Sequence, residues 1–426
     1  MTAAAPPYPS ARRAWTVVLI LFVTAVLAYT DRQVLSLLVD PIKHDLHTDD
    51  TGMSLLLGLA FAMVYGAAGV PLGVLADRTS RRNLIIGGIV VWSLGTLMCG
   101  LASSFQMLFV ARIVVGLGEA VLSPAAISLI SDTFPPEKRG SAVGVYFTGI
   151  AIGIGGSILI GGGVLEVVRA GLFAMSPLAG WAPWRLVFLA IGAPSLLWAL
   201  VLLLVQEPVR RQDQVEVQGA SDASSSPRGW LLIAPVFLVV AVASLVDNAV
   251  GAWSPSLLIR RFGLDPATVG VELGVLLMLG YGGGMLAGGA LADRFAAWRG
   301  SRGKVELCAW AVLAALPAAL ALSSGNATFV LAAVTVYFAV SAVVTASGLS
   351  AILDATPNRA RGRAMAISFF LNVAIGAGLG PTAVALAGRH VVGEAAGLGP
   401  AISFTVIACY VAAGLALISA IRARRT

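Results

Sequence analysis

The feature that most constrains this chain is its series of long apolar runs. Twelve such runs are separated by short polar segments. They cover residues 15–39, 53–76, 83–104, 107–130, 141–165, 185–206, 230–258, 268–292, 304–323, 327–353, 364–388 and 401–421. A helix of about 20 apolar residues is long enough to cross the hydrocarbon core of a bilayer. The sequence therefore predicts an all-α integral membrane protein with twelve transmembrane helices.

The composition excludes the main alternatives. The chain of 426 residues is 58% hydrophobic and 12% charged, whereas soluble domains carry about 25% charged residues. So few charges cannot cover a soluble surface, which argues against a soluble enzyme, a nucleic-acid-binding domain or a disordered chain. The 48 glycines and 20 prolines interrupt apolar runs, as transmembrane helices tolerate.

Lysine and arginine predict the orientation. If the N-terminus is cytoplasmic, the cytoplasmic linkers and both termini hold 20 of these residues and the opposite side holds 6. Positive residues are enriched on the cytoplasmic side of membrane proteins. We therefore expect a multi-pass protein of the cell (inner) membrane with both termini in the cytoplasm.

The chain contains an internal repeat. A polar linker at 207–229 separates an N-terminal six-helix bundle at 1–206 from a C-terminal one at 230–426. G-V-L-A-D-R at 73–78 recurs as G-A-L-A-D-R at 289–294, and the D-x-x-P-x-x-x-R-G-x-A pattern from Asp132 recurs from Asp354. Two parallel repeats are typical of alternating-access transporters whose site lies near the midplane between the halves.

Four ionisable residues lie inside the apolar runs of the N-terminal half: Asp31, Arg32, Arg112 and Glu119. Each costs roughly 2.5–3.5 kcal/mol to insert, so such residues are functional by default. At 1.5 Å per residue, Glu119 lies at the midplane, with Asp31 about 6 Å and Arg112 about 10 Å outside it. Arg112 and Glu119 share one helix face, and Asp31 lies deep enough to pair with Arg112.

These residues predict proton coupling and anion binding. A carboxylate in a low dielectric favours its protonated form and a nearby arginine opposes this, so a substrate anion that competes for the arginine changes the proton affinity. We expect Glu119 to be the proton carrier, with Asp31 as the second choice. Arg112 and Arg32 are expected to bind a phosphate or carboxylate group, because arginine presents a planar fork of donors. The alternative is a buried ion-pair network that only locks two helices together.

The C-terminal half has fewer charges. Asp247 and Asn248 are the counterparts of Asp31 and Arg32, whereas the positions equivalent to Arg112 and Glu119 are Val334 and Ser341. We expect a mainly apolar wall, which favours an amphiphile over a sugar. Its expected lining, for which ordinary helix packing is the alternative, comprises Phe338, Phe369, Phe370 and Asn372.

No cofactor is expected. No G-x-x-x-x-G-K-[ST] motif exists, which argues against ATP. The three cysteines fall in separate runs and indicate neither a disulfide nor a metal site. The expected partners are the substrate, protons and the bilayer, with no nucleic acid and with a monomeric protein.

The motifs resemble the major facilitator superfamily. G-x-L-A-D-R-x-S-R-R at 73–82 is similar to its signature between helices 2 and 3. Y-T-D-R-Q at 29–33, A-R-I-V-V-G-L-G-E-A at 111–120, F-P-P-E-K-R at 134–139, Trp184-Arg185 and Q-E-P at 206–208 resemble the Spinster-like lipid transporters. The resemblance implies a rocker-switch cycle with an inner gate. The residues placed at this gate are Asp77, Arg78, Arg81, Asp293, Arg139 and Arg361.

The sequence thus predicts a secondary active transporter rather than an enzyme. The expected substrate is a lysophospholipid or sphingoid-type lipid, moved with protons. The first alternative is an organic-anion or sugar-acid symporter of the same fold, because those proteins share the R-x-x-x-G-x-x-E-A pattern of helix 4. A membrane receptor would require an appended soluble domain, and a membrane enzyme would require a nucleophile–base set or metal cluster.

Overall fold

The computed structural model describes residues 8–210, 227–356 and 361–423. Within these residues, twelve helices are long and apolar enough to cross a membrane. They coincide with the twelve predicted spans to within a few residues at most ends, and all-α architecture is confirmed. By their contacts, the residues form two compact units.

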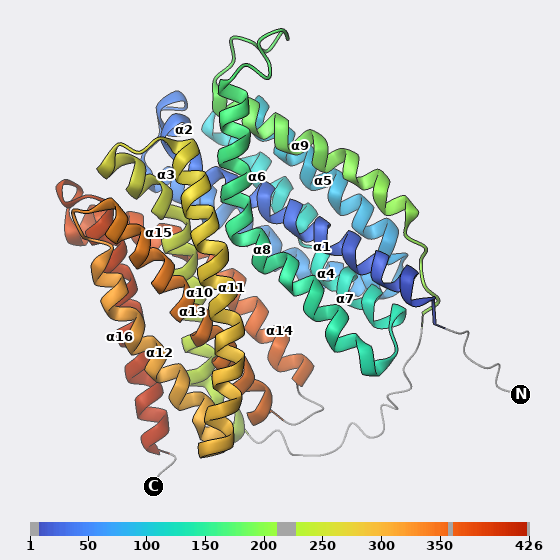
Figure 1. Ribbon diagram of the computed structural model, residues 1–426, viewed down its shortest axis with the longest axis vertical. Coiled ribbons are helices and arrows are strands. Elements are labelled where there is room, and N and C mark those ends of the chain that lie inside the picture. The colour runs from blue at the N-terminus through green and yellow to red at the C-terminus, as the bar shows by residue number, and fades with distance from the viewer. Residues whose placement is uncertain (1–7, 211–226, 357–360, 424–426) are drawn as a thin grey trace, which may run out of the picture. The chain divides into compact units, whose positions relative to one another are not determined.

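The first unit contains residues 1–34 and 63–222. Its helices, coloured blue to green in Figure 1, are α1 (Ala11–Gln33), α4 (Ala60–Arg78), α5 (Arg81–Leu101), α6 (Phe105–Glu119), α7 (Leu122–Thr133), α8 (Pro136–Arg169), α9 (Pro183–Val201) and the short η3 (Leu202–Leu204). The first three residues of α4 belong to the second unit.

The second unit contains residues 35–62 and 223–426. Its early elements are η1 (Val34–Leu37), α2 (Val39–Asp45), α3 (Asp50–Ser54) and η2 (Leu55–Leu59). Its later helices are α10 (Pro227–Phe262), α11 (Pro266–Arg299), α12 (Ser301–Ala321), α13 (Ala327–Ala355), α14 (Arg361–Leu371), η5 (Asn372–Ala377), α15 (Gly378–Ala387), η6 (Gly388–Val392), η7 (Glu394–Ala396) and α16 (Leu398–Ala423).

Side-chain caps define where several spans begin. Ser80 and Ser104 precede α5 and α6, and their hydroxyls accept hydrogen bonds from the N–H groups three residues later at 3.2 Å each. Asp265 and Asn326 play the same part before α11 and α13. The first N–H groups of a helix have no partner inside it, so these caps fix the start of each span.

Glycines bring neighbouring helices into close contact within each unit. A Cβ at Gly118 of α6 would lie 2.4 Å from the backbone N of Trp92 on α5, and one at Gly95 would lie 2.8 Å from that of Val115. Gly149 and Gly153 bring α8 equally close to Phe22 and Tyr29 of α1. Small residues let helix backbones approach in membranes, and Gly149 and Gly153 do so along α8.

The segment 35–62 makes its contacts with the second unit, although the chain enters it from α1 and leaves it through α4. A Cβ at Gly58 would lie 2.6 Å from the carbonyl oxygen of Ala377, at the start of α15. The Ser54 hydroxyl lies 3.3 Å from that of Thr382. Figure 1 shows α2 and α3 in blue at the end of the yellow-to-red helices. Residues 35–62 therefore belong by their contacts to the second unit, although they precede the predicted boundary at the 207–229 linker.

Candidate functional site

Glu119 lies at a break in the helix that carries it. α6 ends at Glu119 and α7 begins at Leu122, both within the single apolar span Phe105–Thr133, which agrees with the span predicted over 107–130. Pro124 explains the break, because proline has no N–H and its ring crowds the carbonyl four residues earlier. Glu119 is only 4% exposed, and one of its carboxylate oxygens has no hydrogen-bond partner among the described residues.

Two guanidinium groups lie close to this carboxylate. Among the charged side chains, Arg32 has the strongest electrostatic interaction with Glu119, and Arg112 has the next strongest. Arg112 is buried on the same face of α6, as predicted from the seven-residue spacing. Its Nη2 donates a 3.3 Å hydrogen bond to the carbonyl oxygen of Arg32. That carbonyl lies near the C-terminal end of α1, where helix carbonyls need outside partners.

Asp31 does not form the predicted ion pair with Arg112. Both oxygens of its buried carboxylate are without a hydrogen-bond partner among the described residues. Trp92 and Thr96 of α5 and Ser195 of α9 surround it, and the Trp92 Nε1 and Ser195 Oγ atoms are likewise unpaired there. Arg112 acts on Asp31 through its charge, and its Nη2 donates to the α1 backbone.

Three tyrosines border these charges, and of the three only Tyr29 belongs to a motif that the sequence singles out. Tyr29 lies under the Arg32 guanidinium, 5.6 Å from ring centroid to Cζ. Tyr146 of α8 shares a hydrogen bond of 3.3 Å with Ser123 of α7, and Tyr65 of α4 lies within electrostatic reach of Tyr29 and Glu119. The tyrosines lie on three separate helices, so no sequence spacing relates them, and only the packing brings them together.

The second unit carries a polar cluster where the sequence predicts a mainly apolar wall. The Tyr337 hydroxyl of α13 donates a 3.1 Å hydrogen bond to the Asp247 carboxylate of α10. Ser341, the counterpart of Glu119, lies beside the same carboxylate and shares a 3.0 Å hydrogen bond with the Tyr410 hydroxyl of α16. The tyrosines were missed because each falls in an ordinary apolar run.

The other residues expected at this wall have different surroundings. Phe338 is buried and its ring centroid lies 6.3 Å from that of Tyr281 and 5.4 Å from that of Tyr337, which matches the helix-packing alternative. Asn248 Nδ2 donates to the carbonyl oxygen of Ser244 at 2.9 Å. A second set is more accessible: Phe369 and Phe370 are about half exposed and Asn372 is partly exposed.

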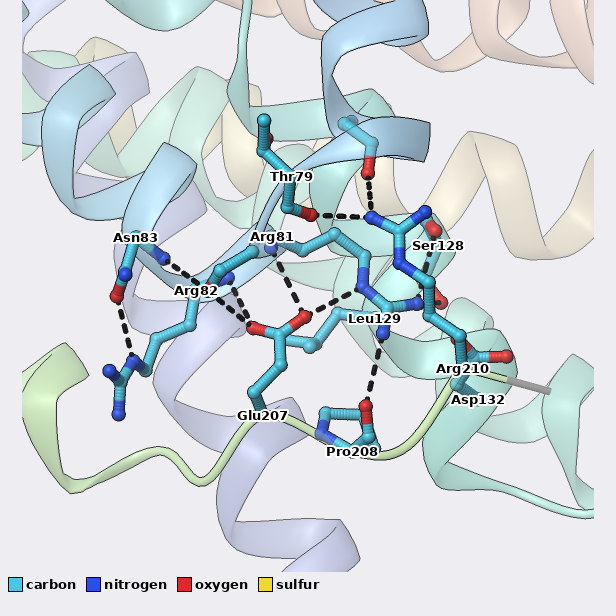
Figure 2. Close-up of polar contacts among 12 residues, drawn as sticks. Thr79, Arg81, Arg82, Asn83, Ser128, Leu129, Asp132, Glu207, Pro208 and Arg210 are labelled. Atoms are coloured by element: carbon cyan, nitrogen blue, oxygen red, sulfur yellow. Dashed lines mark hydrogen bonds and ion pairs between the residues drawn. The ribbon is translucent and has the colours of Figure 1, made fainter.

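Among the predicted gate residues, Arg81 is held by a network inside the first unit (Figure 2). Its Nε donates to Glu207 at 2.9 Å and its Nη1 forms an ion pair with Asp132. A further hydrogen bond of 3.2 Å joins Nη2 to the carbonyl oxygen of Pro208. Arg81 is 1% exposed, so this network fixes the start of α5 to the end of α7 and to the segment after α9.

Glu207 accepts from four donors at once. Its oxygens lie 3.1 and 2.8 Å from the backbone N atoms of Arg81 and Arg82, and 3.0 Å from the Ser80 hydroxyl. Partial burial acts to raise the pKa of Glu207, but the N–H of Arg82, the two donors of Arg81 and the Ser80 hydroxyl together hold it below its ordinary value. A carboxylate at the positive end of α5 is also favoured by the helix dipole.

The repeated aspartate makes an ion pair in each unit. Asp132 pairs with Arg81, and its counterpart Asp354 pairs with Lys304 at 2.5 Å. The two copies of the internal repeat therefore share an ion pair of this aspartate as well as a sequence pattern.

The remaining gate residues contribute less to these networks. Arg78 and Asp293 are exposed, and Arg139 donates from Nε to the carbonyl oxygen of Phe134 at 3.1 Å. The side chains of Asp77 and Arg361 lie outside the described residues. Within the described ranges, no group of three or more His, Cys, Asp or Glu residues is placed to hold a metal ion.

The twelve apolar helices, the repeated motifs and the buried charges are those of a membrane transporter, and comparison with known proteins agrees. Residues 21–381 match the Major Facilitator Superfamily. The chain belongs to this superfamily.

Individual members of the superfamily are similar to this chain over most of its length. An MFS-type efflux pump of Mycolicibacterium smegmatis is 31% identical over 88% of this chain and 84% of its own. The Hexuronate transporter of Bacillus subtilis is 28% identical over 65% of this chain and 64% of its own. Among solved structures, a bacterial homolog to the human lysosomal transporter Spinster, in an inward-facing and occupied conformation, matches with a TM-score of 0.81. It is 27% identical, and the match covers 97% of this chain and 98% of that one.

Proposed function

We propose that this protein moves an amphiphilic lipid with an anionic headgroup, such as a lysophospholipid or a sphingoid-type lipid, and that protons drive the movement. Glu119 carries the proton and Asp31 assists it. Arg112 and Arg32 bind the anionic headgroup. The cycle is an alternating-access rocker-switch, and the protein works as a monomer in the inner membrane with both termini cytoplasmic.

The observation that carries the proposal is the environment of Glu119. The carboxylate is buried, keeps one oxygen unpaired among the described residues and lies within reach of two guanidinium groups. A buried carboxylate is stable when it is protonated or when cations balance it. A substrate anion that engages Arg32 or Arg112 removes part of that balance, so Glu119 then takes up a proton. This links headgroup binding to protonation.

The tyrosines support an anionic headgroup. Tyr29 and Tyr65 are partly exposed beside Arg32, and hydroxyl donors next to a guanidinium suit phosphate or carboxylate oxygens. In the second unit, the half-exposed Phe369 and Phe370 offer apolar surface to an acyl chain. Phe338, Asp247, Asn248 and Asn372 stay predicted as substrate contacts, and the gating roles of Asp77, Arg78, Arg81, Asp293, Arg139 and Arg361 stay predictions as well.

The proposal is tested by substrate-induced proton movement in proteoliposomes that contain a pH-sensitive dye. A lysophospholipid and a sphingoid phosphate are each expected to change the internal pH, and Glu119→Gln is expected to reduce the change to background. The matched control is Glu166→Gln, which alters an exposed glutamate of the same unit and should keep the full response. Retention of lipid-driven proton movement in Glu119→Gln would rule out Glu119 as the carrier.

A sugar-acid symporter is the second candidate, which the similarity to the Hexuronate transporter favours. A hexuronate carries the same carboxylate chemistry for Arg32 and Arg112 but has no acyl chain. The same assay separates the two candidates, because a response to hexuronate without any response to either lipid assigns the protein to this class.

A further inference from the structure

Asp247 is a carboxylate whose neighbours among the described residues are hydroxyl groups rather than cations. Tyr337 donates to it at 3.1 Å and Ser341 lies beside it. Ser341 in turn shares a 3.0 Å hydrogen bond with Tyr410. Tyr337, Ser341 and Tyr410 are all fully buried, whereas Asp247 itself is partly exposed. The three hydroxyl groups come from α13 and α16, which both pack against α10.

The described groups that face Asp247 are neutral. The titratable ones are Tyr337 on α13, Tyr410 on α16 and, behind Tyr410, Cys308 on α12. Among the described residues, no charged side chain of α11, α15 or η5 acts on the carboxylate, and it forms no salt bridge. Asp247 therefore differs from its sequence counterpart Asp31, which feels the charge of Arg112.

The charge balance of the two clusters follows from this difference. In the first unit, Asp31 and Glu119 are matched by Arg32 and Arg112. An ionised Asp247 would have no such match in the part of the chain that the structure describes, and an unbalanced charge within a membrane-spanning helix is expensive. Such a group neutralises by binding a proton. The hydroxyl neighbours are compatible with the protonated form, because one oxygen accepts from Tyr337 while the other, as O–H, can donate to Ser341 Oγ when Ser341 donates to Tyr410.

We infer that Asp247, held by Tyr337 and the Ser341–Tyr410 pair, is a second proton-binding site in the second unit, separate from the Glu119 and Asp31 site. The proton comes from water and returns to water, with no other bond made or broken. This inference rests on the proposed function in that the proton is taken to move with the transport cycle. Asp247 then takes up its proton without the release of a balancing arginine, because no cation among the described residues acts on its carboxylate.

Infrared spectroscopy of the purified protein tests whether Asp247 holds a proton, and it does not depend on transport. A protonated carboxyl has a carbonyl stretch that an ionised carboxylate lacks. At neutral pH, Asp247→Asn is expected to remove one component of this band. Asp354→Asn is the matched control, because Asp354 is paired with Lys304 and should contribute nothing to it. A spectrum of Asp247→Asn that superimposes on the wild-type spectrum would overturn the inference.

Tyr337→Phe gives a second reading that keeps the carboxyl group. The Asp247 component is expected to persist but to move to higher frequency, because the carbonyl loses its hydrogen bond from Tyr337. An unchanged frequency would show that Tyr337 does not hold the protonated group. This variant also keeps the inference testable if Asp247→Asn does not fold.

Transport measurements test whether this proton moves with the cycle. At zero membrane potential, the limiting ratio of substrate concentrations across the membrane gains one factor of the proton concentration ratio for each coupled proton. Asp247→Asn, which lacks one such proton, is therefore expected to reach a substrate ratio lower than that of the wild type by about one factor of the imposed proton concentration ratio. Equal accumulation in wild type and variant would overturn the coupling role. If the protein does not couple transport to protons, the proton gradient changes substrate accumulation in neither the wild type nor the variant, while the infrared band of Asp247 is still observed. Failure of the proposed coupling can therefore be distinguished from failure of the second proton-binding site.

Discussion

Arg81 carries its charge in a position that is almost closed to water. Its guanidinium engages Asp132, Glu207 and the carbonyl of Pro208, so each of its three nitrogen atoms has an acceptor. Lysine could not replace this fork, because an ammonium is a single point of charge. The residue that the superfamily resemblance places at a gate therefore also stabilises its own unit.

Removal of this charge is expected to destabilise the protein. Arg81→Gln leaves Asp132 and Glu207 without their cation, and loss of one partner of a buried ion pair costs about 3–5 kcal/mol. The thermal midpoint of the detergent-purified variant should fall clearly. Arg78→Gln is the control, since Arg78 is exposed and its replacement should leave the midpoint nearly unchanged. Equal midpoints for the two variants would contradict this account.

Glu207 makes part of the stability depend on pH. Its pKa is lower in the folded protein than its ordinary value of about 4.5. A group with a lowered folded pKa contributes stability above its unfolded pKa and loses it as the pH falls through the folded pKa. The thermal midpoint should therefore fall with acidification below the ordinary range of glutamate, and Glu207→Gln should show a lower midpoint at neutral pH and a smaller fall. A parallel pH profile in the variant would exclude Glu207 as a contributor.

At the scale of elements, glycines set the distance between α5 and α6. A Cβ at Gly118 would meet backbone atoms of α5 at 2.4 and 2.7 Å, and backbone cannot rotate away as a side chain can. Gly118→Ala is expected to destabilise the protein by about 1–3 kcal/mol through overpacking.

The matched control for this variant is Gly87→Ala on α5, where nothing lies within 4 Å of the new Cβ. Alanine in a helix interior is then favourable by about 0.5–1 kcal/mol. Thermal unfolding of both variants in the same detergent should therefore show opposite signs. A stabilised Gly118→Ala would mean that α5 and α6 lie farther apart than the structure shows.

At the scale of the whole molecule, the second unit is built from both parts of the sequence. Arg260 at the end of α10 binds Asp40 at 2.7 Å and both oxygens of Asp50 at 2.7 and 2.8 Å. Gly58 packs against the backbone of Ala377. Residues 35–62 thus complete a unit whose other helices follow the linker.

This arrangement predicts that the protein tolerates a break in the linker. Two fragments divided within residues 211–226 and produced together should co-purify through a tag on the second fragment, because the first supplies residues 35–62. Asp50→Asn should reduce the recovery, since it weakens the bidentate contact with Arg260. Asp45→Asn is the control on the neighbouring α2. Recovery of the tagged fragment alone would contradict the shared unit.

The sequence by itself determined the membrane architecture. Apolar runs long enough to cross a bilayer leave helices as the form that satisfies every backbone group, so the positions of the twelve spans follow from the apolar runs alone. The buried positions of Asp31, Arg112 and Glu119 follow from the same reasoning, as does the shared face of Arg112 and Glu119.

Only the tertiary structure decided how these residues are partnered. The donation from Arg112 to the α1 backbone and the positions of Tyr337, Ser341 and Tyr410 around Asp247 depend on helix rotation and approach. Apolar runs carry no such information, because a transmembrane helix is apolar on the faces toward lipid and toward protein alike. The tertiary structure also decided that residues 35–62 belong to the second unit. Their contacts are with helices that follow the linker, and such contacts between distant segments leave no mark in the apolar pattern.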